Sequence, residues 1–262
     1  MAKKLRFETR YYRAIPLDRA GYEFTETELE ADKTALVVLH CWDIGCEGGP
    51  AVDKNFLVGM GSLESFAEAG RILREVIRPA MDAARAAGVL VAHVEHPNIW
   101  AKHRSCEAEQ DPPRSPSSDD YHPPEAVPGW RQRIVDRSHG KDYATKSPYA
   151  TMDRAKVAAA RADEPMVYQS GQFDRVLRQR GIENLIYTGF ATDMCILRAP
   201  GGIGDMFGFG YRCYLMRDAT VGIEFPDTIE ERISTRWAIR FHETHSGDTL
   251  ESKDFIRACR GA

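Results

Sequence analysis

The sequence predicts an α/β fold in which a mostly parallel, doubly wound sheet is covered by helices on both faces. Short apolar runs alternate along the chain with segments whose apolar residues recur at helical spacing. Residues 35–39 and 185–188 are apolar runs without a charged residue, which is typical of strands buried on both faces. Hydrophobic residues make up 43% of the 262, enough for one ample core.

The remaining elements are predicted from periodicity and from turn residues. Apolar residues at helical spacing over 66–87 predict an amphipathic helix that Gly88 ends, and residues 89–94 follow as the second strand. The other predicted elements are a small helix at 155–162, a strand at 165–169, a helix at 173–180, a strand at 211–216, a helix at 226–245, an edge strand at 248–250 and a last helix capped by Ser252.

Two segments do not fit the alternation. Residues 1–33 mix charged and aromatic side chains, and we expect an arm that packs on the domain at 34–262 or on a neighbouring subunit. Residues 95–146 are polar and rich in Pro and Ser, which predicts a long loop insertion within the domain. A loop of that length is usually a lid, an oligomer contact or partly disordered.

Charge and cysteine content exclude several classes of partner. A net charge of -4 gives no general attraction to nucleic acid or to an anionic membrane, and no apolar run is long enough to span one. The N-terminal residues lack the apolar core of a signal peptide. The six cysteines show no disulfide-framework spacing, so we expect reduced thiols and a cytoplasmic location.

The most informative stretch is the junction that follows the strand at 185–188. Gly189 ends the strand, and Thr192 is placed to cap a helix in which Cys195 is the third residue. A thiol at a helix start faces unpaired backbone N–H groups, so its pKa is expected to fall toward that of a reactive thiolate. The same N–H groups, from Ala191 to Cys195, are candidates for an oxyanion hole. A buried structural cysteine is the competing interpretation.

Residues 189–195, which read Gly-Phe-Ala-Thr-Asp-Met-Cys, resemble the G-x-x-T-x-x-C nucleophile segment of the isochorismatase-like cysteine hydrolases. The resemblance extends to Phe173–Leu177, Gly181-Ile182, Gly210-Tyr211, Arg217–Ala219 and the strand at 35–39, from about residue 33 onward. It implies a three-layer doubly wound α/β fold and an Asp-Lys-Cys triad that hydrolyses C–N bonds of small amides through a thioester. Relatives commonly assemble, so the resemblance also implies a homo-oligomer.

Two positions depart from that triad. His40 stands where the family's Asp closes the first strand, and Gln169 stands where its Lys closes the third. Because the carboxyl ends of parallel strands meet at one edge of the sheet, we expect His40, Gln169 and Cys195 to converge there. Trp42 and Asp43 follow His40, and we predict that they bind substrate together with Phe190, Ala191 and Thr192.

We therefore expect a cysteine hydrolase that needs no cofactor and acts on a small amide, ureide or related compound. Cys195 is the expected nucleophile, and His40 either takes the thiol proton or forms a thiolate–imidazolium pair in advance. Gln169 is the expected hydrogen-bond donor to the substrate. The alternative is a catalytically silent binding protein of the same fold. A metal hydrolase that uses His40, His93 or His96 ranks last, with His96 as a weak metal candidate.

Overall fold

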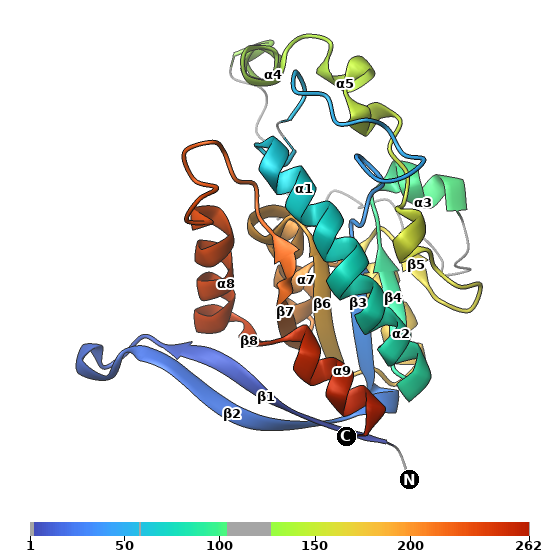
Figure 1. The fold of residues 1–262 in the computed structure, drawn as a ribbon, viewed down its shortest axis with the longest axis vertical. Coiled ribbons are helices and arrows are strands. Elements are labelled where there is room, and N and C mark those ends of the chain that lie inside the picture. The colour runs from blue at the N-terminus through green and yellow to red at the C-terminus, as the bar shows by residue number, and fades with distance from the viewer. Residues whose placement is uncertain (1–2, 58, 104–126, 262) are drawn as a thin grey trace.

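The computed structural model describes residues 3–57, 59–103 and 127–261. Eight strands form one sheet in the order β2-β1-β8-β7-β6-β3-β4-β5 (Figure 1). The strands from β3 to β8 pair in parallel, and β1 pairs antiparallel with both β2 and β8. Their bounds are β1 Lys4–Arg13, β2 Gly21–Glu30, β3 Thr34–Leu39, β4 Leu90–Val94, β5 Met166–Val167, β6 Asn184–Phe190, β7 Arg212–Val221 and β8 Gly247–Leu250.

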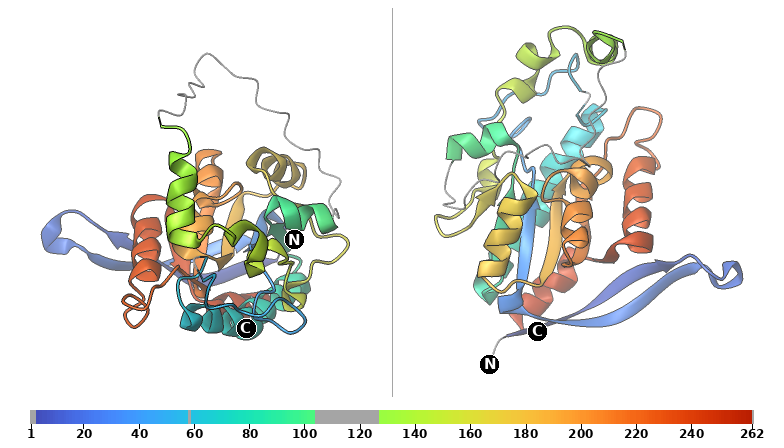
Figure 2. Two further views of the ribbon diagram at one scale, coloured as in Figure 1. Left: turned by 90° about the horizontal axis from the view of Figure 1, so that it is seen from above. Right: turned by 180° about the vertical axis from the view of Figure 1, so that it is seen from behind.

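Helices cover both faces of the sheet, as the sequence predicts. One face carries α1 (Leu63–Ile72), a π-helical stretch (Leu73–Ile77), α2 (Arg78–Ala87) and α9 (Ser252–Arg260) (Figure 1). The other face carries α6 (Ser170–Gln179), α7 (Ile203–Gly208) and α8 (Ile233–His245) (Figure 2). The three-layer doubly wound arrangement is thereby confirmed.

The buried strands supply both cores by simple alternation. In β3 the side chains of Leu36 and Val38 enter the core under α1 and α2, whereas those of Ala35, Val37 and Leu39 enter the core under α6 and α7. Side chains alternate between the faces of a strand, so a strand covered on both sides must be apolar at every position. This is why the run at 35–39 contains no polar residue.

Two of the predicted helices are shorter than expected. The predicted helix at 155–162 is one 3-10 turn, Lys156–Ala158, and the predicted helix at 226–245 begins only at Ile233. The described parts of 95–146 hold α3 (Pro97–His103), α4 (Trp130–His139) and α5 (Tyr143–Lys146), so the loop is partly helical. Residues 104–126, with Cys106, lie outside the described residues. Further 3-10 turns are Leu17–Arg19, Ala31–Lys33 and Pro148–Ala150.

The N-terminal arm is a hairpin of β1 and β2 that widens the sheet. Its base is part of the core, because Leu5 and Phe7 are buried and the Phe7 ring lies 6.5 Å from that of Phe255 in α9. The hairpin then extends beyond the body of the molecule (Figures 1 and 2). Because β1 pairs with β8, the strand predicted at the edge lies inside the sheet.

Candidate functional site

Cys195 lies just beyond the carboxyl end of β6, in a π-helical turn, Thr192–Ile196. Burial raises the pKa of its thiol; the backbone N–H of Ala191 opposes this by favouring the thiolate, and the Asp193 carboxylate raises the pKa further. The expected fall in pKa is therefore wrong for the free protein. The N–H groups of Met194 and Ile196 both donate to the Ala191 carbonyl, so the first turn directs fewer N–H groups at the sulfur than expected.

His40 follows β3, the strand next to β6. Its backbone is left-handed, with φ at 49°, and its N–H donates to the Val94 carbonyl at 2.9 Å. A left-handed backbone is uncommon for a residue other than glycine. Such residues cluster at active sites and ligand-binding sites, where the surrounding structure holds the strained backbone in place. Burial lowers the pKa of His40 to about 4, and the charges of His96 and Arg154 add to this. The imidazole is therefore neutral at neutral pH.

An aromatic cluster joins the two strand ends. The Trp42 ring centroid lies 6.3 Å from that of His40 and 6.4 Å from that of Phe190, and Trp42 and Phe190 are buried. The Tyr149 ring contacts Trp42 edge-on, with centroids 5.9 Å apart. Trp42 therefore stands between the residue that follows β3 and the last residue of β6. Sequence reasoning missed Tyr149, because no local pattern around it indicates a site.

Two of the predicted site residues, Asp43 and Thr192, form structural hydrogen bonds, and a third, Gln169, lies at a distance from the others. An Asp43 carboxylate oxygen accepts from the Asp153 N–H at 2.8 Å, which fastens one loop to another. The Thr192 hydroxyl bonds to that of Thr220 at 2.7 Å and does not cap the turn. Gln169 immediately precedes α6, and β4 lies between its strand, β5, and β3. The structure therefore groups His40, Trp42 and Phe190, places Ala191 and Cys195 directly after Phe190 beyond the end of β6, and leaves Gln169 farther out along the same edge.

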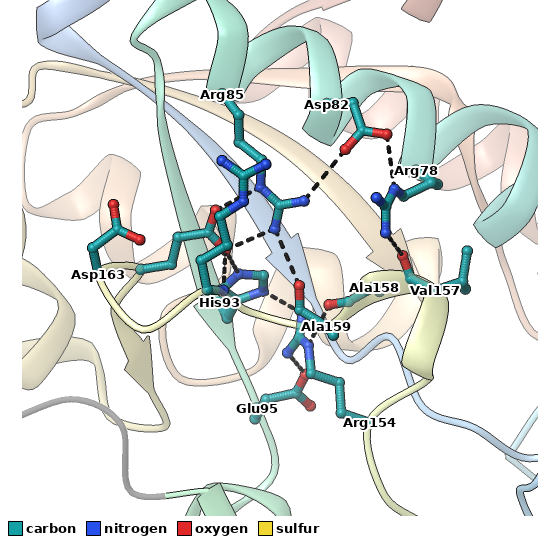
Figure 3. A network of polar contacts seen from close by, with 12 residues as sticks. Arg78, Asp82, Arg85, His93, Glu95, Arg154, Val157, Ala158, Ala159 and Asp163 are labelled. Atoms are coloured by element: carbon teal, nitrogen blue, oxygen red, sulfur yellow. Dashed lines mark hydrogen bonds and ion pairs between the residues drawn. The ribbon is translucent and has the colours of Figure 1, made fainter.

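Beside this group lies a buried network that begins at the carboxyl end of β4 (Figure 3). The Arg154 guanidinium donates to the Glu95 carboxylate and to His93 Nδ1, and both acidic and basic partners are buried. His93 Nε2 bonds to Glu164 at 2.8 Å, and Glu164 also pairs with Arg85 of α2. Burial raises the pKa of Glu95 to about 7 and lowers that of His93 to about 3. The network holds Arg154 in place, and the charge of Arg154 helps to lower the pKa of His40.

No group of three or more His, Cys, Asp or Glu side chains in the described part of the chain is arranged to hold a metal ion. His96 is exposed and its Nδ1 accepts from the Asn98 N–H at 3.2 Å, while His93 is committed to the network described above. Within the same residues no helix is both long and apolar enough to cross a membrane.

The sequence of this chain is similar to those of known proteins. The family model for the isochorismatase domain matches residues 55–228, more than half of the chain. Ureidoacrylate amidohydrolase RutB of Rhizobium rhizogenes is 31% identical over 208 residues, which are 78% of this chain and 76% of that protein. The RutB protein of Agrobacterium fabrum is 30% identical over 208 residues, covering 78% of this chain and 82% of that protein.

Among solved structures, a cysteine hydrolase from Pseudomonas syringae pv. phaseolicola superposes with a TM-score of 0.54 at 18% identity, covering 89% of this chain and 95% of that one. That likeness shows the fold alone. Together with the matched family model and the RutB relatives, it leads to one conclusion. The chain belongs to the isochorismatase family, within the isochorismatase-like cysteine hydrolase superfamily that its nucleophile motif resembles.

Proposed function

We propose that this chain hydrolyses a C–N bond of a small amide, ureide or related compound through a thioester on Cys195. The observation that carries the proposal is the position of Cys195 just beyond the central strand β6, with His40 directly after the neighbouring strand β3. The backbone N–H of Ala191 favours the thiolate form of Cys195. The relatives named ureidoacrylate amidohydrolase support a substrate of the ureide class.

The chemistry begins from two neutral groups. Because burial keeps the Cys195 thiol protonated and His40 unprotonated, the proton passes to the imidazole as the sulfur attacks, and not beforehand. The C–S bond forms and the carbonyl electron pair moves to oxygen, where backbone N–H groups of the turn at 192–195 stabilise it. When the C–N bond breaks, His40 returns the proton to the departing nitrogen.

Hydrolysis of the thioester reverses these roles. His40 takes a proton from water as the water oxygen attacks the carbonyl carbon, and the C–S bond then breaks to release the acid and restore the thiol. Trp42 and Phe190 wall the pocket, and Gln169 donates a hydrogen bond to the outer end of the substrate. Asp43 and Thr192 serve indirectly, because their side chains hold the surrounding loops.

A silent binding protein is the second candidate, and one observation favours it. Gln169 carries no charge where the family's Lys stands, and burial moves the pKa values of Cys195 and His40 away from a reactive ion pair. In that case the pocket binds a small molecule without turnover.

The test is release of ammonia or amine from a panel of small amides and ureides that includes ureidoacrylate. We expect Cys195→Ala to fall to background. His40→Asn keeps a residue that tolerates the left-handed backbone, and we expect it to lose about 10²- to 10⁴-fold, the usual contribution of a general base. Cys46→Ala, at a half-buried loop cysteine, is the matched control and should keep its activity. A fully active Cys195→Ala enzyme would contradict the proposal.

A further inference from the structure

The turn that carries Cys195 is bonded to the chain segment that follows the neighbouring strand, β7. The two strands β6 and β7 pair up to the last residue of each. Beyond this pairing, the Asp193 carboxylate oxygen Oδ1 accepts a hydrogen bond from the Ile223 N–H at 2.8 Å. Asp193 lies two residues before Cys195 in the same π-helical turn. Its side chain therefore joins the turn to the segment after β7.

That segment is itself held by the start of α8. The Gly222 N–H donates to the Thr235 hydroxyl at 2.9 Å. The Thr235 hydroxyl and the Thr235 N–H both donate to Glu224 Oε1, at 2.7 and 2.8 Å, and the Thr235 and Glu224 side chains are buried. Hydrogen bonds to a carboxylate are stronger than those between neutral groups. Because the residues on both sides of Ile223 are bonded to α8, its N–H is a donor in a fixed place.

Gly222 leaves the room that the Asp193 carboxylate needs. A Cβ added at Gly222 would lie 2.9 Å from Asp193 Oδ1, 3.1 Å from the Thr235 nitrogen and 3.2 Å from the Thr235 hydroxyl oxygen. The backbone of Gly222 is not left-handed, so its conformation does not call for glycine. A side chain at position 222 would displace the carboxylate from Ile223. The glycine is therefore explained by the contact.

The charge of Asp193 does not help the nucleophile. Burial raises the pKa of Cys195, and the Asp193 carboxylate raises it further, so the charge disfavours the thiolate. What Asp193 offers the reaction is its hydrogen bond, which restricts where the turn lies. Position matters for attack on a carbonyl carbon, since a misplacement of about 1 Å costs about 10²-fold in rate.

We propose that Asp193 is a positioning residue, whose hydrogen bond to the Ile223 N–H holds the Cys195 turn in the orientation from which the sulfur attacks. This inference rests on the proposed function. Asp193 takes no proton in the reaction, and its bond to Ile223 persists throughout. Because the bond needs an acceptor oxygen and not a charge, asparagine can replace Asp193 and alanine cannot.

The test follows the alkylation of Cys195 by iodoacetamide from pH 7 to pH 11, with mass spectrometry of the Cys195 peptide. The midpoint of the pH profile reports the pKa of the thiol, and the plateau at high pH reports access to the sulfur. We expect Asp193→Ala and Gly222→Ala to raise the plateau by up to about tenfold, because the turn loses one hydrogen bond and opens more often. Asp193→Asn should keep the plateau of the wild type and lower the midpoint, because it removes only the charge.

Controls in the same samples separate a released turn from an unfolded protein. Cys213 and Cys259 are buried free thiols, and they should stay unmodified in every variant. Gly208→Ala, at a helical glycine where a Cβ meets open space, should match the wild type. In hydrolysis we expect Asp193→Ala to lose about 10²-fold in kcat with KM little changed, and Asp193→Asn to restore kcat.

Two results would overturn the inference and leave the Cys195 nucleophile standing. One is a plateau in Asp193→Ala and Gly222→Ala no higher than that of the wild type. The other is modification of Cys213 and Cys259 together with Cys195, which would show that the whole protein opens. A wild-type Cys195 that resists alkylation at every pH would overturn the proposed function, and this inference with it.

Discussion

Tyr149 and Gly59 lie so close together that position 59 has no room for a side chain. A Cβ at Gly59 would overlap both the hydroxyl and the ring of Tyr149, and Gly59 has no left-handed backbone to explain its presence. The glycine is therefore required by contact and not by conformation.

Gly59→Ala should consequently push the Tyr149 ring away from Trp42. We expect Gly59→Ala to lower the free energy of unfolding in urea by about 1–3 kcal/mol, because the added methyl group overpacks this contact. Gly208→Ala is the control, since a Cβ at that helical glycine meets open space and alanine favours the helix, so stability should be unchanged or slightly higher. A Gly59→Ala protein as stable as the wild type would show that this contact does not restrict the residue at position 59.

The residues of the site were only partly predictable from the sequence. Cys195 and His40 were found because each follows an apolar run that fixes a strand end. Tyr149 was not found, because it reaches the site only through its contact with Trp42, which lies more than a hundred positions away in the sequence. The pKa of Cys195 was predicted in the wrong direction, since burial outweighs the helix start and burial cannot be read from residue type.

At the scale of elements, α8 shows why helix ends were less predictable than helix faces. The apolar stripe suggested a start near residue 226, yet the helix begins at Ile233 because the buried Glu224 carboxylate accepts from the N–H groups of Ser234 and Thr235. A carboxylate from the preceding loop thus caps the helix, and no side chain within the stripe reveals it. The predicted end of the helix at Gly88 was correct, because the C-cap there is left-handed, with φ at 76°, a conformation that glycine adopts readily.

Another element-scale device is the link between β4 and the segment at 151–164. The Arg154 side chain is 3% exposed and that of Glu95 is fully buried, so this ion pair is shielded from water. Arg154 Nε also donates to the Ala158 carbonyl at 2.6 Å, and this bond holds the turn between the two residues. The pair therefore holds in place the backbone that lies against residues 41–43.

Arg154→Met should destabilise the protein by about 3–5 kcal/mol, because it leaves the buried Glu95 carboxyl group without its partner. The exposed pair Arg78–Asp82 is the matched control, and Arg78→Met should cost under about 1 kcal/mol. Chemical unfolding measures both. If the double variant Arg154→Met/Glu95→Leu is no more stable than Arg154→Met, the unpaired carboxylate is not the cause of the loss.

At the scale of the whole molecule, the three layers were predictable from the sequence, but the two N-terminal strands that extend the sheet were not. The apolar runs predicted the central strands, whereas the hairpin at the N-terminus has an exposed face along much of its length and gave no strand signal. Ile15 and Leu17 at its tip are 78% and 85% exposed. The homo-oligomer implied by the resemblance, and the separate arm at 1–33, stay predictions.

Buried histidines make the free energy of unfolding depend on pH. Burial lowers the pKa of His93 to about 3 and those of His40 and His242 to about 4, below the ordinary value of 6.5. Between pH 6.5 and pH 4.5 the unfolded chain therefore binds protons that the folded chain does not. Each such group lowers the free energy of unfolding as the pH falls through this range, by at most about 1.4 kcal/mol per pH unit.

Glu95 opposes this trend, because burial raises its pKa from 4.5 to about 7 and the folded state binds the extra proton. Because the histidines with strongly lowered pKa values outnumber carboxylates with a shift as large as that of Glu95, the free energy of unfolding should rise from pH 4.5 to pH 6.5, as measured by urea titration at each pH. Carboxylates whose pKa is lowered, such as Glu164, lose their contribution only below this range. His242→Gln should reduce the slope, whereas Glu95→Gln should steepen it. A slope that is the same in all three proteins would mean that these groups titrate alike in the folded and unfolded states.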